Sequence, residues 1–397
     1  MTKPLALALV VSALVASAQE PLPRAKPEEV GLSSSGLAEA TALLKQYVAE
    51  QRIAGAVAGI ARQGRIAYLE AVGVQDLESR APMTERSLFR IYSMTKPVTA
   101  VAVMMLQEQG RFQLSDPVSK YLPEFANVHV RGADGSTRPP SQPITIQDLL
   151  LHTSGLSHRT SDLYRTERVR SRAQPLPQFI TNIVRAPLME DPGTRYRYSE
   201  GTTVLGRLVE VWSGQPFDAF LQARVLDPLG MTDTTFWVRP DQRARLATVY
   251  APGLTPVEIE DVPFTERPAL IEGAVGLVST VPDYLRFSQM LLNGGELGGR
   301  RLLNPKTVAT MTANGLSDAV LKSRGGSMGW GLANVNVVID PASPLRGEYG
   351  WDGTAGTIFW IDPARLMITV LMTQSSPANP NGIRQAFKKL AQQAITN

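Results

Sequence analysis

Apolar and polar positions follow helical spacing in some stretches and strand spacing in others, and the first 110 residues contain both. Residues 33–51 carry apolar side chains at intervals of three and four, which predicts an amphipathic helix. Residues 55–73 form two apolar runs on either side of Gln63-Gly64, a pattern that indicates a hairpin of two strands. Residues 93–110 predict a second helix, which Gly110 would end.

The rest of the chain divides into a helical middle and a strand-rich end. Residues 111–269 contain Pro-rich loops and short helical patterns at 146–151, 201–212 and 216–225. After a helix at 284–292, strand patterns return at 331–339, 356–361 and 366–373. Residues 381–395 predict a closing amphipathic helix.

Both ends of the chain therefore supply strands and a helix, and they most simply share one antiparallel sheet flanked by helices. The sequence predicts an α/β (α+β) domain that is assembled from residues 19–110 and 270–397. Residues 111–269 are expected to form an all-helical domain inserted between the two halves.

The composition narrows the chemistry that a site could use. The chain of 397 residues has no cysteine, which excludes a disulfide scaffold, thiol catalysis and Cys-ligated metal centres. It has three histidines, His129, His152 and His158, so a His-rich metal site is not expected. We expect neither a metal nor an organic cofactor. With 43% hydrophobic residues, a chain of this length can bury a sizeable core.

Residues 1–18 have the pattern of a secretory signal peptide. Lys3 supplies a positive start, residues 5–15 form an apolar core, and Ala16-Ser17-Ala18 is a small-residue cleavage site before Gln19. The apolar run is shorter than the roughly 20 residues that a membrane-spanning helix needs. We therefore expect an exported protein, periplasmic or secreted, without stable membrane insertion.

The net charge of +4 is small for this length, and charges of both signs are interspersed. The densest basic stretch, residues 165–172, has four arginines and one glutamate. It lacks the regularly interleaved aromatic residues of a single-strand nucleic-acid binder. We expect this stretch to be a solvated loop or helix face, and we expect no nucleic-acid partner.

A serine and a lysine stand three residues apart at the start of the second predicted helix, in Ser93-Met94-Thr95-Lys96. On a helix this spacing puts both side chains on one face, so Lys96 Nζ could reach Ser93 Oγ. A serine hydroxyl needs a base to become a nucleophile, and a lysine serves as that base once burial or nearby positive charge lowers its pKa. The plain alternative is a helix-capping serine followed by a surface lysine.

Two further stretches could complete a site. In residues 196–200, Tyr198 stands at the entrance to a helix and could shuttle a proton between Ser93, Lys96 and a leaving group. That role requires an adjacent ammonium to lower the pKa of Tyr198 from about 10. In residues 350–356, small residues could let a substrate lie against the backbone, where one N–H would help to form an oxyanion hole. The plain alternatives are a packed tyrosine and a glycine-rich hairpin.

Together these motifs resemble the serine β-lactamase and penicillin-binding-protein superfamily, in which S-x-x-K, Y-x-N or S-x-N, and K-T-G occur in this chain order. The most similar members are class C β-lactamases and, better, family VIII carboxylesterases. The resemblance covers most of residues 30–395 and includes residues 149–156 (LLLHTSGL), 276–280 (GLVST) and 283–295. It implies a β-lactamase-like fold, with an antiparallel sheet flanked by helices and an inserted helical domain.

The resemblance also implies a role for each residue of the site. Ser93 would be the acylated nucleophile, Lys96 and Tyr198 the general-base pair, and the N–H groups of Ser93 and Thr354 the oxyanion hole. The residues expected to contact the substrate are Trp351, Asp352, Gly353 and Glu200.

Two positions depart from the β-lactamase pattern. Trp351 stands where K-T-G has its lysine, which helps to hold the carboxylate of a β-lactam. An indole cannot do so, and Asp352 beside it would repel a carboxylate; a tryptophan here is similar to the W-x-G of family VIII esterases. Glu200 stands where many relatives have asparagine, which removes an amide donor for an acyl-chain carbonyl. Both departures favour esters over β-lactams.

We therefore expect a serine hydrolase, most simply a carboxylesterase (EC 3.1.1-like) for short to medium acyl esters. The alternatives are a β-lactamase or D-aminoacyl peptidase, an acyltransferase that passes the acyl group to an alcohol, and a non-catalytic ligand sensor. A β-lactam carboxylate would need another cation, such as Arg324 or Arg346. A Ser-His-Asp hydrolase is disfavoured because G-x-S-x-G is missing, and His152 is expected to brace its turn. The sequence predicts no particular oligomeric state.

Overall fold

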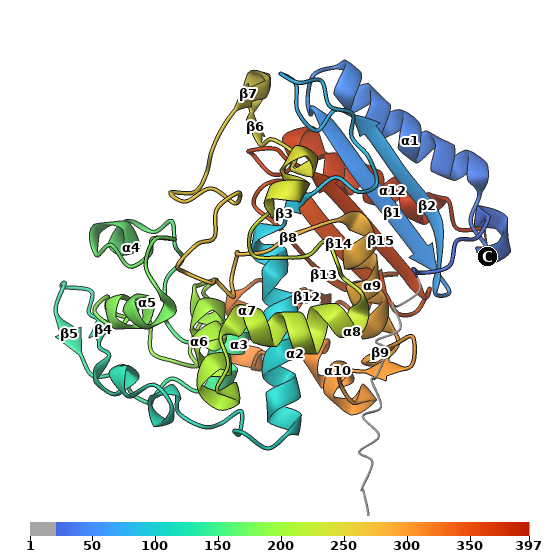
Figure 1. Cartoon of the computed structure of the whole chain (residues 1–397). Coiled ribbons are helices and arrows are strands. Elements are labelled where there is room, and N and C mark those ends of the chain that lie inside the picture. Colours follow the sequence, from blue (N-terminus) through green and yellow to red (C-terminus); the bar gives the residue numbers. More distant parts are fainter. Residues whose placement is uncertain (1–20, 397) are drawn as a thin grey trace, which may run out of the picture.

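A seven-stranded antiparallel sheet forms the centre of the molecule in the computed structural model, which describes residues 21–396 (Figure 1). Its strands lie in the order β11-β12-β13-β14-β15-β1-β2. They span Gly55–Arg62 (β1), Arg65–Gly73 (β2), Met328–Gly331 (β11), Val335–Val338 (β12), Tyr349–Asp352 (β13), Thr357–Asp362 (β14) and Met367–Thr373 (β15). The two ends of the chain thus build one sheet, as predicted, whereas the predicted signal peptide lies outside the described residues.

The hairpin of β1 and β2 forms because its turn residues adopt left-handed backbone. Gln63 has φ 51° and Gly64 has φ 77°, as a two-residue type I′ turn requires. Arg62 pairs with Arg65 directly across this turn, so the predicted hairpin is confirmed. Every residue of β1 is buried, because helices cover both faces of the sheet at this strand.

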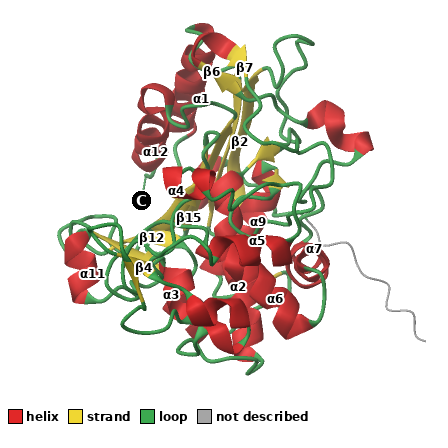
Figure 2. Ribbon diagram, turned by 90° about the vertical axis from the view of Figure 1, so that its left-hand side faces the viewer, coloured by secondary structure: helices red, strands yellow, loops and turns green. Residues whose placement is uncertain are grey.

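Alternate residues of β1 face two separate helical layers (Figure 2). Ala56, Ala58 and Ile60 belong to the apolar cluster beneath α1 (Ser34–Ala49) and α12 (Ile383–Gln393), which pack side by side. Val57 belongs to the main core on the other face, with α2 (Thr95–Glu108) and α9 (Val281–Leu292). α2 crosses this core and brings its first turn toward the sheet (Figure 1).

The remaining elements are short. The other helices are α3 (Ile146–Leu151), α4 (Asp162–Thr166), α5 (Leu176–Ile183), α6 (Gly201–Ser213), α7 (Phe217–Leu221), a π-helical turn (Gln222–Leu226), α8 (Asp227–Leu229), α10 (Pro305–Met311) and α11 (Asp318–Ser323). The two-stranded pieces are β3 (Phe89–Arg90) with β8 (Val278–Ser279), β4 (Val130–Arg131) with β5 (Thr137–Arg138), β6 (Tyr250–Ala251) with β7 (Thr255–Pro256), and β9 (Glu296–Leu297) with β10 (Arg300–Arg301). Residues 111–269 are not all-helical as predicted, because they include β4 with β5 and β6 with β7, although most of their regular structure is helical. The exact domain boundaries stay a prediction.

Within residues 21–396, no helix combines the length and the apolar character that crossing a bilayer requires.

One strand prediction was wrong in a way that matters for the site. Residues 331–339 were predicted as one strand, but β11 ends at Gly331 and β12 begins only at Val335, with Asn334 in left-handed backbone (φ 58°) between them. The turn residues Leu332, Ala333 and Asn334 are all buried, so the turn lacks the exposed polar residues that usually mark one, and within it only Asn334 breaks the apolar run. Tyr349–Asp352, expected to be part of a glycine-rich link, forms the next strand, β13.

Candidate active site

Ser93 lies in a short 3₁₀ turn, Tyr92–Met94, that follows β3 and leads directly into α2. The helix itself begins at Thr95, two residues later than predicted. Tyr92 has φ 41°, a conformation that a bulky residue rarely adopts, and it turns the chain sharply just before the serine. After the serine, the Tyr284 hydroxyl donates a hydrogen bond to the Met94 carbonyl at 2.9 Å. These constraints hold Ser93, which is only 5% exposed, on a well-anchored segment.

Lys96 is fully buried in the first turn of α2. Its Nζ donates a hydrogen bond to the Ala274 carbonyl at 3.0 Å and lies 4.6 Å from the centre of the Tyr198 ring. Burial lowers the pKa of Lys96 to about 8, even though the Glu200 carboxylate raises it, and the charge of Arg159 lowers it further. About a tenth of the amine is therefore neutral at pH 7 and about half at pH 8, and this neutral form can accept a proton.

Tyr198 connects the serine to the opposite wall of the site. Its hydroxyl makes a hydrogen bond with Ser93 and accepts one from Trp351 Nε1 at 3.1 Å. Burial raises the pKa of Tyr198, and these two hydrogen bonds offset the rise only in part. The expectation that an ammonium lowers this pKa is therefore wrong. Tyr198 is a neutral phenol that can relay a proton, and Lys96 is the better proton acceptor.

The aromatic wall beside Tyr198 includes residues that sequence reasoning missed. Trp330 is fully buried; its Nε1 donates to the Leu150 carbonyl at 3.1 Å, and its ring meets that of Trp351 edge-on at 4.5 Å. His158 stacks on Tyr198 with ring centres 5.6 Å apart. The only signal for His158 was its position two residues after the 149–156 motif. Trp330 had no signal, because it stands one residue before the strand predicted at 331–339.

His152 braces the turn after α3, as the sequence predicts. It is the C-cap residue of α3 in left-handed backbone, and its Nδ1 lies 3.1 Å from Ser199 Oγ. Burial and the nearby positive charge of Lys96 hold the pKa of His152 well below its usual value. The ring is therefore neutral, and no carboxylate hydrogen-bonds to it among the described residues, so a Ser-His-Asp arrangement is absent there.

Asp352 does not stand as the lone negative charge that the sequence suggested. Arg384, on α12, donates to Asp352 Oδ2 at 2.9 Å and to the carbonyls of Gly353 and Thr357 at 2.8 and 3.1 Å. The guanidinium side chain is 8% exposed and the Asp352 side chain 44%. The expected repulsion between Asp352 and an anionic substrate is therefore largely neutralised, a correction that follows from a partner 32 residues further along the chain.

Gly353 brings the end of β13 into contact with the segment that carries Ser93. A Cβ at Gly353 would lie 2.4 Å from the Ile91 carbonyl oxygen, so a side chain here would push the two segments apart. The N–H groups of Ser93 and Thr354 flank this contact, and neither donates to another described residue. Two free donors on adjoining segments suit an oxyanion hole, and their catalytic role stays a prediction.

Glu200 is fully buried at the N-terminus of α6. Its Oε2 accepts a hydrogen bond from Thr203 Oγ1 at 3.1 Å, while Oε1 has no partner among the described residues. Burial raises the pKa of this carboxyl, but nearby positive charges outweigh burial and hold it below its usual value. Those charges are Lys96, His158, Arg159 and Arg170. The predicted contact of Glu200 with substrate stays a prediction, and in this structure its surroundings are basic side chains.

The arginine-rich stretch is only partly the solvated face that we expected. Arg165 and Arg168 are exposed, but Arg172 is 1% exposed and packs its guanidinium 3.8 Å from the centre of the Phe264 ring. Arg170 is also mostly buried and makes ion pairs with Glu260 and Glu272, which lie about 100 positions away. The prediction was wrong for these two residues because their partners are remote in sequence.

Arg324 and Arg346, the other cations considered as carboxylate anchors, are placed differently from each other. The Arg324 guanidinium lies 4.2 Å from the centre of the Tyr196 ring and donates to the carbonyls of Met328 and Gly329 at 2.9 and 2.8 Å. Arg346 is exposed in the loop between β12 and β13.

Comparisons with known proteins agree with this arrangement. The Beta-lactamase family model matches residues 40–394, so the chain belongs to the Beta-lactamase family. It is 32% identical to Esterase EstB of Burkholderia gladioli, over 90% of this chain and 95% of the esterase. It is 28% identical to a putative D-alanyl-D-alanine carboxypeptidase of Escherichia coli K12, over 94% of this chain and 90% of that protein.

A solved structure gives the same result for the fold. EstCE1, described as a hydrolase with promiscuous acyltransferase activity, superposes with a TM-score of 0.79 at 28% identity and covers 91% of this chain and 99% of its own. The protein is therefore a β-lactamase-fold serine hydrolase related to esterases and carboxypeptidase-like proteins. The family and the fold class inferred from the sequence are both confirmed.

The pairing of Arg384 with Asp352 predicts unequal costs for removing either partner. Replacing Arg384 by Met leaves Asp352 Oδ2 without a donor and removes one of the two donors of the Gly353 and Thr357 carbonyls. We expect a loss of about 1–3 kcal/mol in the free energy of unfolding. Asp352→Asn leaves the two carbonyl contacts in place and should cost clearly less. Urea unfolding followed by circular dichroism measures both. Equal losses would contradict the view that the backbone contacts of Arg384 hold the end of β13.

Proposed function

We propose that the protein is an exported carboxylesterase that hydrolyses esters of short to medium fatty acids through an acyl-enzyme on Ser93. The observation that carries the proposal is the indole of Trp351, which hydrogen-bonds to the Tyr198 hydroxyl and thereby forms an aromatic wall next to the nucleophile. An aromatic wall favours an acyl chain over a carboxylate. The relation to EstB, which is named an esterase, supports this choice, and export rests on the pattern of residues 1–18.

Acylation starts from the Ser93 hydroxyl hydrogen-bonded to Tyr198. As Ser93 Oγ bonds to the ester carbonyl carbon, its proton passes by way of Tyr198 to the neutral amine of Lys96. The N–H groups of Ser93 and Thr354 stabilise the oxyanion of the tetrahedral intermediate. When the intermediate collapses, the carbon–oxygen bond to the alcohol breaks, and the alcohol leaves with the proton returned from Lys96.

Deacylation repeats the sequence with water as the attacking group. The Lys96–Tyr198 pair takes a proton from water, the hydroxide oxygen attacks the acyl carbon, and Ser93 leaves with a proton while the carboxylic acid departs. Attack by an alcohol instead of water would transfer the acyl group to that alcohol. This is the second candidate function, supported by the description of EstCE1 as a hydrolase with promiscuous acyltransferase activity.

Loss of the nucleophile should abolish hydrolysis without affecting the fold. Ser93→Ala is expected to lower kcat on p-nitrophenyl butyrate by a factor on the order of 10⁶, as nucleophile loss does in a comparable serine hydrolase. Ser288→Ala, which removes a buried hydroxyl on α9, is the matched control and should stay active. Intact mass after brief mixing should show one butyryl group on the wild type and none on Ser93→Ala. A folded, active Ser93→Ala protein would refute the assignment.

The pKa of Lys96 predicts how activity depends on pH. The neutral amine is the reactive form, so kcat/KM for p-nitrophenyl butyrate should rise with pH and level off above about 8. Below that value, each pH unit should cost about tenfold. Lys96→Arg keeps the positive charge but cannot lose it in this range, so both activity and the rise should vanish. A rise centred near 6 would instead indicate that a histidine is the base.

Replacing Trp351 by Lys should move the substrate preference toward β-lactams. A new ammonium could make a charge-assisted hydrogen bond of roughly 1.5–3 kcal/mol with a β-lactam carboxylate. The ratio of kcat/KM for a cephalosporin to that for p-nitrophenyl butyrate should therefore rise about tenfold or more. Trp351→Phe keeps an aromatic wall and should leave this ratio unchanged. If the wild type hydrolyses penicillins faster than butyrate esters, the esterase proposal is wrong and the β-lactamase or peptidase alternative holds.

A further inference from the structure

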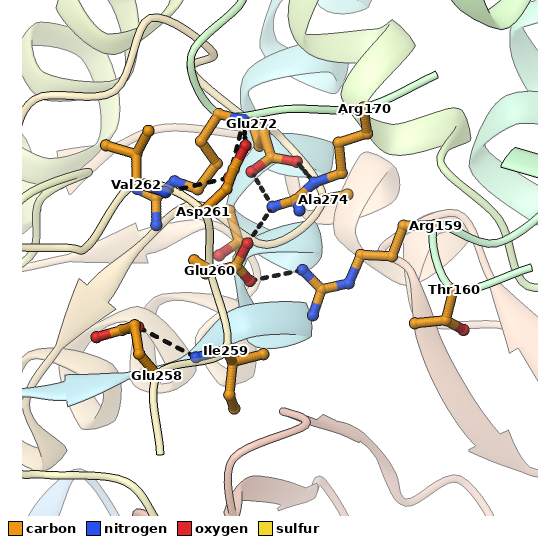
Figure 3. Close-up of polar contacts among 12 residues, drawn as sticks. Arg159, Thr160, Arg170, Glu258, Ile259, Glu260, Asp261, Val262, Glu272 and Ala274 are labelled. Carbon is orange, nitrogen blue, oxygen red and sulfur yellow. Dashed lines mark hydrogen bonds and ion pairs between the residues drawn. The ribbon is translucent and has the colours of Figure 1, made fainter. Parts of the chain in front are cut away.

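Four buried charged residues form a continuous chain of ion pairs behind the site, here called the Arg–Glu chain: Arg159, Glu260, Arg170 and Glu272 (Figure 3). Glu260 accepts from Arg159 Nη1 at 2.8 Å and from Arg170 Nη2 at 2.6 Å. Arg170 then makes two hydrogen bonds with the Glu272 carboxylate. The side chains of both glutamates are 1% exposed, so these charges interact in a largely water-free environment.

One end of the Arg–Glu chain is connected to the amine of Lys96. Glu272 stands two residues before Ala274, whose carbonyl accepts the hydrogen bond from Lys96 Nζ at 3.0 Å. Between them, the Gly273 carbonyl accepts from Thr99 Oγ1, on α2, at 2.8 Å. A Cβ at Gly273 would lie 2.5 Å from the Thr202 carbonyl oxygen, so the segment is clamped between α2 and α6. The ion pair of Glu272 thus anchors the strip of backbone that holds Lys96.

The other end of the Arg–Glu chain reaches the residue before the nucleophile. The Arg159 guanidinium carbon lies 5.4 Å from the centre of the Tyr92 ring, which also packs edge-on against Phe264. Tyr92 has the left-handed backbone that aims the chain at Ser93. One cluster of charges therefore borders both halves of the Ser93–Lys96 pair.

Stability alone is a weak reason for such a cluster. Removing charges from water costs about as much as the ion pairs return, and apolar side chains of similar volume often do as well. Burying Glu200 costs more than burying a paired glutamate, because one oxygen of its carboxylate has no hydrogen-bond partner among the described residues. Groups that are expensive to bury and that surround a reactive amine are typical of functional tuning.

We propose that Glu200 and the Arg–Glu chain are positioning residues for Lys96, which hold its amine in place and set the pH at which it can accept the Ser93 proton. The proposal rests on the proposed function, in which Lys96 is the base. The carboxylates and the arginine change the pKa of Lys96 in opposite directions. The carboxylates of Glu200 and Glu272 raise the pKa of Lys96, whereas the charge of Arg159 lowers it, within the larger lowering by burial.

The other groups around Lys96 carry little charge in the relevant range. The ring centres of His152 and His158 lie 4.8 and 5.6 Å from that of Tyr198. Burial lowers the pKa of each histidine below its usual value, so both rings are neutral near pH 8. Tyr198 keeps its proton there because burial raises its pKa. Of the titratable groups facing Lys96, the two histidines and Tyr198 are therefore neutral. The charged groups are Glu200, Glu272 and Arg159, with Arg170 behind them in the Arg–Glu chain.

The test measures the reactivity of Ser93 without any ester. Diisopropyl fluorophosphate labels an activated serine: Ser93 Oγ bonds to phosphorus, fluoride leaves, and the hydroxyl proton goes to Lys96. The labelling rate, followed by intact mass from pH 5 to 10, should rise with pH as Lys96 loses its proton. Glu200→Gln and Glu272→Gln should move this rise to lower pH by about one unit, and Arg159→Gln should move it to higher pH by a similar amount. Arg159→Lys keeps the charge and should leave the rise near the wild-type position.

Glu258→Gln is the matched control, because Glu258 is on the same loop but is 46% exposed and pairs with Arg90 at 3.7 Å. Glu258→Gln should leave the pH at which the labelling rate rises unchanged. Unshifted profiles in folded variants, or shifts in one common direction for the Glu and Arg variants, would overturn the proposal. If Arg159→Gln does not fold, an unshifted profile of folded Glu200→Gln would suffice to overturn it. If the wild type is labelled and the variants shift its labelling profile as described, but the wild type hydrolyses no ester, the proposed function is refuted and this inference stands. If the wild type is not labelled at any pH, both are refuted.

Discussion

The candidate site depends on the burial of one amine, that of Lys96, away from water. An ammonium in the interior is costly, and a fully buried lysine must either lose its proton or find compensating partners. Lys96 does both: burial lowers its pKa, while a backbone carbonyl, an aromatic ring and nearby carboxylates receive its charge when it is protonated. The fold supplies this environment by placing α2 in the main core, where it packs against α6, while the turn before it, Tyr92–Met94, packs against β13.

Much of the fold could be predicted because its signals are local. Helical spacing marked α1, α2, α9 and α12 to within a few residues, and the left-handed turn at Gln63-Gly64 marked the hairpin. The prediction failed where burial hides the signal. The turn between β11 and β12 consists of buried residues, and the single polar residue in it, Asn334, is too weak a signal to separate two strands. Four-residue strands such as β13 are likewise too short for alternation to separate them from a loop.

The candidate site divides along a similar line. Ser93, Lys96, Tyr198 and Trp351 could be found because each stands in a short motif with a chemical reason for its residue types, and the structure brings them together. Arg384 and the partners of Arg170 could not be found. The sequence does not show whether an arginine is solvated or pairs with a carboxylate about 100 positions away. The buried charges behind the site could therefore be recognised only in the folded structure.

The order of the strands also affects how the protein is made. β15 lies between β14 and β1, and its partners in β1 come more than 300 residues earlier, as in the pairing of Ala56 with Thr373. The ribosome must therefore synthesise nearly the whole chain before β15 can pair with β1. Folding depends on contacts between residues far apart in sequence, and we expect it to be slow for that reason. Until then the β1–β2 hairpin presents an unpaired apolar edge, a template for association with other chains. Translation stalled shortly before β15 would thus release an aggregation-prone product rather than a partly active enzyme.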